Sequence, residues 1–296
     1  MTAASPDWNS AIQAEQGQSD FSIKSIVLPL DNYEKSRTAI PVARALSELY
    51  RCELYMTYVG EGQSDMKHFA GQLALTPEQA RDAVSEQRHK KPVGAVASAS
   101  QHPEGLLVLS TALGEQESEK RFGMLTEAFL ATKPQKAVLV NAERGEKPWS
   151  LHRILLAHDG TPVSNPAVIA AADMAQRAGA EVIALHVAAR GEERPEARGS
   201  IAAPLYVDQA HHEWPAWAEE FMNRVVASGA LSSGVHFQLK VTGGQAGSEL
   251  AEVAQQCNVD LVIMAWHGHW AEHEDCATRV VIRNAGSPVM LVYSGS

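Results

Sequence analysis

The chain has 296 residues, of which 45% are hydrophobic and 20% are charged, and its formal net charge is -10. This length allows two domains of ordinary size, each with its own core, and the composition is that of a soluble globular protein. The acidic balance argues against binding to nucleic acid or to an anionic membrane, because proteins bind both through clustered lysine and arginine side chains. No apolar run reaches the roughly 18 residues that a membrane-spanning helix needs.

The N-terminal residues 1–22 have neither the basic start nor the apolar centre of a signal peptide, so we expect a disordered or extended segment there. The three cysteines, Cys52, Cys257 and Cys276, are too few and too scattered for a disulfide framework. Both features favour a cytoplasmic protein.

The first domain is predicted to cover residues 23–142. Short apolar runs indicate its strands, at residues 25–30, 53–59, 93–97, 106–109 and 136–140. An alanine-rich helical stretch follows the first of these runs. The interval between Val96 and Leu106 leaves little room for a helix, so that connection should be short or irregular.

The second domain, residues 151–296, follows a linker at residues 143–150 that contains Gly145 and Pro148. Its strands are expected at residues 153–158, 181–187, 235–241, 260–265 and 288–293. Its helices are expected at residues 165–178, 211–228, 246–256 and 276–285. Strands that alternate with helices predict right-handed crossovers and a parallel sheet.

The two domains repeat one α/β unit. Residues 26–31 (IVLPLD) recur as residues 154–159 (ILLAHD), and the next apolar runs begin at Glu53 and Glu181. The second copy follows the first at one constant offset, since Asp159 lies as far beyond Asp31 as Glu181 lies beyond Glu53. Internal repetition predicts two similar domains, so each candidate site has a twin.

Longer stretches of the second half carry a resemblance to a known family. Residues 241–254 (VTGGQAGSELAEVA), which lead to residues 260–264 (DLVIM), are similar to a strand, glycine turn, helix and strand of the universal stress protein family. Residues 283–292 (RNAGSPVMLV) are similar to that family's terminal motif. Weaker matches occur in both halves, at residues 105–110, 136–140, 158–160 and 185–187. In order and spacing the chain resembles two universal stress protein domains in tandem.

The resemblance implies that each half is a doubly wound, Rossmann-like α/β domain with five parallel strands in an order near 3-2-1-4-5. In such sheets a ligand binds at the carboxyl ends of the strands, where the strand order reverses. The resemblance also implies that the fifth strands pair edge to edge, which hides an exposed sheet edge. We therefore expect the two halves to form an intrachain pseudo-dimer, and the same kind of pairing could join two chains as a homodimer.

ATP-binding members of the family carry an aspartate after the first strand and the phosphate-binding pattern G-x-x-G, nine residues, G-[S/T]. Asp31 and Asp159 match the aspartate. The two candidate nucleotide crevices combine strand ends with loop glycines: Asp31, Val59 and Gly123 in the first half, and Asp159, Val187 and Gly268 in the second. The other interpretation of the two aspartates is that they cap the turn after the strand.

The phosphate-binding pattern is incomplete in both halves, so we expect degenerate ATP sites. In the second half Ala265 stands at the first glycine position, and the loop is shorter than in the first half. Asp275 then falls where a Gly-Ser pair would open a helix, and its negative charge would repel phosphate. In the first half Ser110 and Leu113 stand at the two glycine positions.

His267, His269 and His273 form the densest cluster of potential metal ligands. Neutral imidazoles suit zinc or another divalent transition metal. Their spacing matches no established metal motif, and a solvated, histidine-rich loop is the other interpretation. We expect no bound zinc.

We therefore expect a non-catalytic stress-response protein that acts by binding or regulating an unidentified protein, without a bound cofactor. The sequence has no nucleophile elbow, Walker loop, dinucleotide fingerprint or paired-carboxylate motif. Two alternatives remain open at this point. One is an ATP or adenine-nucleotide switch with weak or no ATPase activity, and the other is a metal-responsive module that uses residues 267–273.

Overall fold

A computed structural model describes residues 21–31, 34–59, 87–89, 104–111, 124–188, 235–268 and 276–295. The first half contains, in chain order, β1 (Ser25–Asp31), η1 (Glu34–Ala39), α2 (Ile40–Tyr50), β2 (Glu53–Val59), β3 (Gln87–His89), β4 (Gly105–Thr111), α6 (Met124–Leu130), β5 (Lys136–Asn141) and η2 (Ala142–Arg144). The second half contains β6 (Arg153–Ala157), η3 (Pro162–Ser164), α7 (Asn165–Ala178), β7 (Glu181–Ala188), β8 (Phe237–Gly243), α9 (Ala246–Gln256), β9 (Leu261–Trp266), α10 (Ala277–Asn284) and β10 (Val289–Tyr293).

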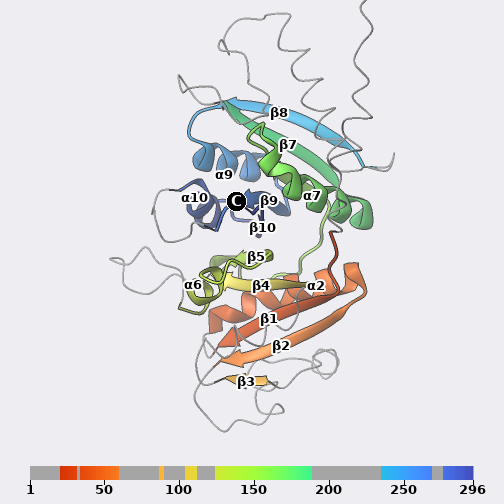
Figure 1. Ribbon diagram of the computed structural model, residues 1–296, viewed down its shortest axis with the longest axis vertical. Helices are drawn as coiled ribbons and strands as arrows, with labels where there is room; N and C mark the ends of the chain where they lie inside the picture. The colour runs from red at the N-terminus through yellow and green to blue at the C-terminus, as the bar shows by residue number, and fades with distance from the viewer. Residues whose placement is uncertain are drawn as a thin grey trace, which may run out of the picture.

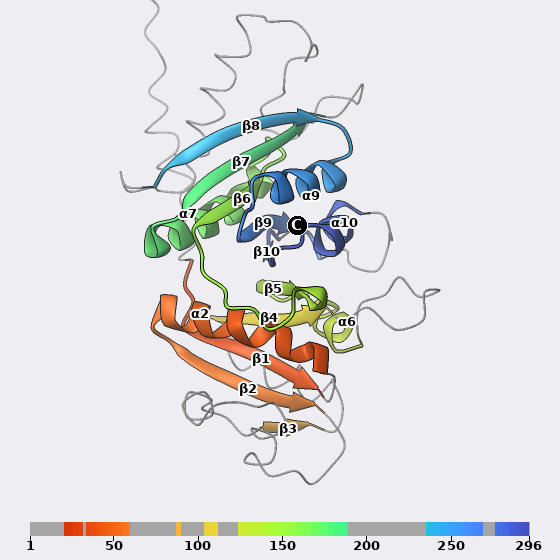
Figure 2. The ribbon, with the colours of Figure 1, turned by 180° about the vertical axis from the view of Figure 1, so that it is seen from behind.

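The described strands form one continuous sheet with the order β3-β2-β1-β4-β5-β10-β9-β6-β7-β8 (Figure 1). Neighbouring strands within each half are parallel, whereas β5 and β10 pair antiparallel where the halves meet. β5 and β10 lie side by side at the centre of the molecule in both views (Figure 1 and Figure 2). Each half has the strand order 3-2-1-4-5, which confirms the predicted fold class of two doubly wound domains joined as a pseudo-dimer.

The strand registers follow the repeat in the sequence. Ser25 lies beside Glu53 in the first half, and Arg153 lies beside Glu181 in the second. Arg153 follows Ser25, and Glu181 follows Glu53, by the same number of residues that separates Asp159 from Asp31. The repeated sequence thus specifies the same strand pairing twice.

The two halves are related by a pseudo-twofold axis. Val138 of β5 lies opposite Met290 of β10. The neighbouring pairs are reciprocal across this point: Leu139 with Val289, and Ala137 with Leu291. Val289 stands as far beyond Ala137 in the chain as Met290 stands beyond Val138, so the axis passes between Val138 and Met290.

Helices cover both faces of the sheet. α2 and α7 contribute Leu46, Val168 and Met174 to the core on one face, and α6 and α9 contribute Phe129 and Leu250 to the core on the other, where α10 also packs. Strands that are buried on both faces require apolar side chains on both. This explains why their sequences read as continuous apolar runs.

Two helices have the bounds that the sequence predicts. α7 covers residues 165–178, and α9 covers residues 246–256. α7 ends at Gly179, whose φ of 65° is the left-handed conformation that glycine adopts without a steric penalty. Clear apolar periodicity and a glycine stop therefore suffice to place such a helix.

The third strand of the first half lies earlier than predicted. β3 is Gln87–His89 and pairs with β2, whereas residues 93–97, where the strand was expected, lie outside the described residues. β3 has a polar sequence and, among the described strands, pairs only with β2, so its hydrophobicity gives no signal. The expected N-terminal segment up to residue 20 and the expected helix at residues 211–228 also lie outside the described residues. No helix among the described residues has the length and apolar character needed to cross a membrane.

Candidate functional site

The strand order reverses once in each half, beside β1 and beside β6. Asp31 and Val59 are register partners at the ends of β1 and β2, which places their backbones at the first reversal point. Their side chains, and Gly123, lie outside what the structure describes. The corresponding residues of the second half, Asp159, Val187 and Gly268, are described and follow or end β6, β7 and β9. The carboxyl ends of these three strands form the second candidate crevice.

Asp159 caps the turn that follows β6. Its Oδ1 accepts hydrogen bonds from the Thr161 N–H (2.9 Å), the Thr161 hydroxyl (2.8 Å) and the Ser164 hydroxyl (2.7 Å). Partial burial raises the pKa of Asp159, but the hydrogen bonds from Ser164 and Thr161 outweigh this effect and bring the pKa below its ordinary value. The capping interpretation of Asp159 therefore has direct geometric support.

Two buried histidines lie beside this turn. The Nδ1 of His158 accepts a hydrogen bond of 2.9 Å from the Gly160 N–H, which leaves the proton of the neutral ring on Nε2. The Nδ1 of His186 lies 3.1 Å from the carbonyl oxygen of His158. Burial lowers the pKa of His158 to about 4, and burial also lowers the pKa of His186. Both rings are therefore neutral at neutral pH.

The loop after β9 is contacted by a lysine from the first half. Gly268 is buried with a φ of 75°, and a Cβ at this position would lie 2.7 Å from Cδ of Lys133. Lys133 follows α6 and itself has a left-handed φ of 52°. The aliphatic part of the Lys133 side chain thus covers the one glycine of the phosphate pattern that the second half retains. The sequence contains no local signal for this contact, since the two residues are far apart in the chain.

Trp266, which precedes this loop, is buried and packs edge-to-face on Tyr293 with ring centroids 6.2 Å apart. Its indole Nε1–H has no hydrogen-bond partner among the described residues. The next residue, His267, is exposed, and its Nδ1 lies 3.0 Å from the Ser294 hydroxyl. His269 and His273 lie outside the described residues, so the predicted metal cluster stays a prediction. Among the residues that the structure describes, no three histidines, cysteines or carboxylates gather as a metal site would require.

At the first reversal point, β4 is tied to η1. The hydroxyls of Ser110 and Thr38 lie 2.9 Å apart, and both donate hydrogen bonds to the carbonyl oxygen of Lys35. The Thr126 hydroxyl donates to the Ser110 carbonyl oxygen at 2.9 Å. Ser110, which stands at the first glycine position of the phosphate pattern, is thus fully engaged with its own domain. No spacing in the sequence indicates Thr38 as its partner.

The registers also give the relative length of the two phosphate loops. Leu106 of β4 and Leu261 of β9 lie beside equivalent residues of the first strand in their halves, Ile26 and Ile154. The number of residues from Leu106 to Leu261, in the fourth strands, is larger than the number from Val138 to Met290, in the fifth strands. The turn between the fourth and fifth strands is therefore shorter in the second half, in agreement with the spacing in the sequence. The larger offset places Ala265 where the first half has Ser110.

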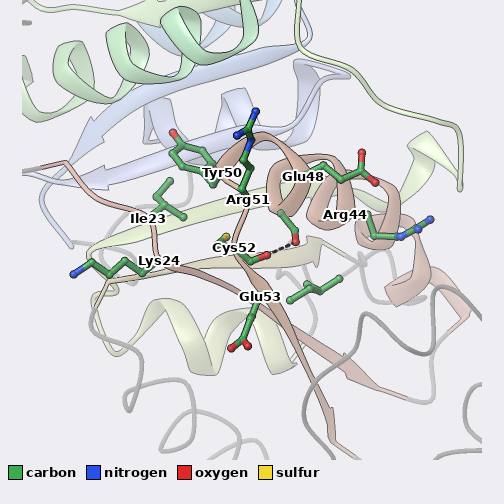
Figure 3. Close-up of a pocket in the computed structure, with 10 residues that line it drawn as sticks. Ile23, Lys24, Arg44, Glu48, Tyr50, Arg51, Cys52 and Glu53 are labelled. Carbon is green, nitrogen blue, oxygen red and sulfur yellow. Dashed lines mark hydrogen bonds between the residues drawn. The ribbon is translucent and has the colours of Figure 1, made fainter.

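A hollow of about 800 Å³ opens at the other edge of the sheet, where β1 and β2 begin and α2 ends (Figure 3). No motif in the sequence indicates it. Its charged side chains Lys24, Arg44 and Glu53 point in different directions instead of converging on one place (Figure 3). This hollow therefore lacks the grouped polar side chains of a ligand site, and the crevices at the carboxyl ends remain the candidates.

Comparisons with known proteins agree with this architecture. Residues 150–292 match the model of the universal stress protein family. The crystal structure of a putative universal stress protein from Pseudomonas aeruginosa UCBPP-PA14 is similar to this chain. It is 16% identical and has a TM-score of 0.63 over 92% of this chain and 94% of its own. A protein of unknown function from Pseudomonas aeruginosa PAO1 is 16% identical, with a TM-score of 0.62 over 96% of this chain and 94% of its own.

A universal stress protein from Archaeoglobus fulgidus DSM 4304 is 14% identical and has a TM-score of 0.60 over 92% of this chain and 98% of its own. A search of curated proteins found no match. The structural similarities extend over both halves, and the sequence match covers the second. Residues 150–292 therefore form a domain of the universal stress protein family, and the first half has the same strand order.

Proposed function

We propose that this protein is a non-catalytic binding and regulatory module of the universal stress protein type, in which neither crevice holds a nucleoside triphosphate tightly. The observation that carries the proposal is that Ser110 in the first half, and Asp159 and Gly268 in the second half, are engaged with other parts of the chain. Two pieces of geometry support it, one in each half.

In the first half, the support comes from Ser110. Its hydroxyl and carbonyl oxygen are both hydrogen-bonded, to Lys35 and Thr126, and η1 lies against the end of β4. A phosphate in contact with Ser110 would have to replace these hydrogen bonds, each of which contributes about 0.5–1.5 kcal/mol. This half therefore favours its own closed arrangement.

In the second half, the support comes from Asp159 and Gly268. Asp159 accepts three hydrogen bonds from its own turn, all through Oδ1. Gly268 is covered by the Lys133 side chain, so its backbone is screened from a ligand approaching on that side. A nucleotide that approached Gly268 from this side would have to displace the exposed Lys133 side chain.

The two histidines near the crevice support the absence of catalysis. Both Nδ1 atoms, in His158 and His186, are directed to backbone groups, and both rings are buried. A general base must reach the proton that it removes. These rings serve the turn between β6 and α7 instead.

The test is a measurement of bound and added nucleotide. Native mass spectrometry of the purified protein is expected to detect no stoichiometric adenine nucleotide. Calorimetric titration with Mg-ATP is expected to give a dissociation constant weaker than about 1 mM, which corresponds to about -4 kcal/mol. A dissociation constant below about 1 μM would overturn the proposal, and its weakening in Asp159→Ala would assign the bound nucleotide to the second half. Asp159→Asn, which keeps an oxygen for the turn, is the matched control that separates ligand contact from folding.

A further inference from the structure

The pseudo-twofold axis brings two oppositely charged residues together at equivalent positions. Arg279 of α10 stands as far beyond Glu127 of α6 in the chain as Met290 stands beyond Val138, the pair at the axis. The Nη1 of Arg279 lies 3.8 Å from Oε1 of Glu127, and the Arg279 side chain is 7% exposed. Glu127 and Arg279 are therefore each other's counterparts and also each other's partners across the axis.

This arrangement differs from that of a true symmetric dimer. In a symmetric pair, a residue at the axis meets its own copy. Two first halves joined in this way would bring Glu127 against Glu127, and two second halves would bring Arg279 against Arg279. Like charges at such a separation repel, and partial burial reduces the screening by water.

A second contact between the halves has the same character. The Tyr50 hydroxyl of α2 donates a hydrogen bond of 2.6 Å to Oδ2 of Asp173 in α7, and the Arg177 guanidinium lies 4.8 Å from the centre of the Tyr50 ring. Tyr50 is 9% exposed. At the sequence spacing that relates Asp31 to Asp159, the counterpart of Tyr50 in the second half is Ala178. The counterpart of Asp173 in the first half is Ala45.

These counterparts cannot reproduce the contact. Two first halves would place the Tyr50 hydroxyl near Ala45, and a buried hydroxyl without a partner is destabilising. Two second halves would leave Asp173 facing Ala178. The contact therefore exists only when a first half meets a second half.

We infer that the surface around β5 and β10 is selective: it accepts the other half as its partner and rejects a second copy of the same half. Glu127, Arg279, Tyr50 and Asp173 determine this selectivity. The apolar contact between β5 and β10 favours association, and a second copy of the same half could make a similar contact. The charged and hydroxyl groups disfavour that second copy. The surface thus serves the pairing of first and second halves, and homodimers of this chain have to use another surface.

The test is a re-sorting experiment on the folded full chain. A protease site is inserted between Lys147 and Pro148, which are exposed linker residues, and the purified protein is cut after folding. Cut Glu127→Arg protein is then mixed with cut Arg279→Glu protein, and the pairs are identified by native mass spectrometry. Two of the possible pairs join opposite charges: the E127R first half with the R279E second half, and the two unchanged halves with each other. The other two pairs join a variant half to an unchanged half and bring like charges together. The opposite-charge pairs are expected to exceed the like-charge pairs at least about tenfold.

The matched control uses an ion pair whose two members belong to the same half. Lys24 and Glu104 form an exposed pair within the first half. Cut Lys24→Glu protein mixed with cut unchanged protein is expected to give a statistical mixture of first–second pairs. A statistical mixture in the main experiment, or abundant first–first or second–second pairs from the unchanged protein, would overturn the inference.

A second measurement on the intact chain decides the case if the cut halves do not stay folded. Urea midpoints are compared for Glu127→Arg, Arg279→Glu and the double variant E127R/R279E. The inference requires the double variant to recover most of the stability that each single variant loses. If the two losses simply add, the charge pair does not determine the pairing, and the inference is wrong.

Discussion

The Nδ1 of His186 lies 3.1 Å from the carbonyl oxygen of His158, so a contact between two buried histidines joins the ends of β6 and β7. His158 in turn accepts a hydrogen bond from the Gly160 N–H. Because both rings are buried and both Nδ1 atoms face backbone groups, the charged form of each ring is disfavoured in the folded protein. We therefore expect acid to destabilise the second candidate crevice.

The free energy of unfolding should fall as the pH drops from 6.5 towards 4. Burial lowers the pKa of His158 from 6.5 to about 4, so in this interval the unfolded chain binds a proton that the folded protein does not bind. Protons then favour the unfolded state, and the loss from His158 reaches about 3 kcal/mol at the lower end. Urea unfolding at a series of pH values measures it.

The control for this prediction is His158→Gln, which removes the titrating ring while keeping an oxygen that can accept the Gly160 hydrogen bond. Its stability should change less steeply over the same interval. Asp159 does not interfere, because its pKa is lowered from 3.8 and its contribution is lost only below that value. Equal slopes for the two proteins would contradict the prediction.

Removing the Asp159 side chain should destabilise the second half even without ligand. Asp159→Ala deletes the acceptor of three hydrogen bonds in the turn before α7, and loss of such a cap costs about 1–2 kcal/mol. Asp159→Asn should stay close to the original protein, since its amide oxygen can take the place of Oδ1. Thermal and urea unfolding check both variants. An unchanged midpoint in Asp159→Ala would show that the cap contributes little.

Alanine at Gly268 should cost more than alanine at Gly286. The two glycines have nearly the same left-handed φ, 75° and 73°, but a Cβ at Gly286 meets nothing within 4 Å. Gly286→Ala should lose about 1 kcal/mol from backbone strain alone. Gly268→Ala adds crowding against Lys133, but this side chain is exposed and flexible and can shift, so the total should be about 1–2 kcal/mol.

The crowding part of this effect can be isolated. Lys133→Ala in the Gly268→Ala background should recover it and leave the strain. Urea midpoints are compared for the unchanged protein, Gly268→Ala, Gly286→Ala and the double variant Lys133→Ala/Gly268→Ala. Equal losses at the two glycines would mean that Lys133 does not lie firmly on this loop.

Removing the Tyr50 hydroxyl should weaken the contact between the halves. Tyr50→Phe deletes the hydrogen bond to Asp173 and is expected to lower the free energy of unfolding by about 1–2 kcal/mol. Burial, followed by the nearby Asp173 charge, raises the pKa of Tyr50 strongly, so the hydroxyl keeps its proton throughout the accessible pH range. Tyr55→Phe, which removes a hydroxyl bonded to Glu53 within one strand, is the control and should have a smaller effect. Similar losses in both variants would be evidence against a special role for Tyr50.

Much of the fold could be predicted from local patterns. α7 and α9 have the expected bounds because their apolar side chains recur at helical spacing, and the apolar runs of β6, β9 and β10 agree with the expected strands to within one residue at each end. β3 could not be placed in this way, since a short polar edge strand carries no hydrophobic signal. The internal repeat correctly indicated two similar domains, and in the structure the first two strands of each half pair with the same register.

The sequence by itself determined the strands, the helices and their duplication, because these depend on side chains that are neighbours in the chain. The tertiary structure alone decided what lies on the candidate crevices and on the axis. Lys133 reaches Gly268, Thr38 reaches Ser110, and Glu127 reaches Arg279 only after the sheet order has brought distant segments together. Such contacts depend on strand order and antiparallel pairing, which no local spacing encodes.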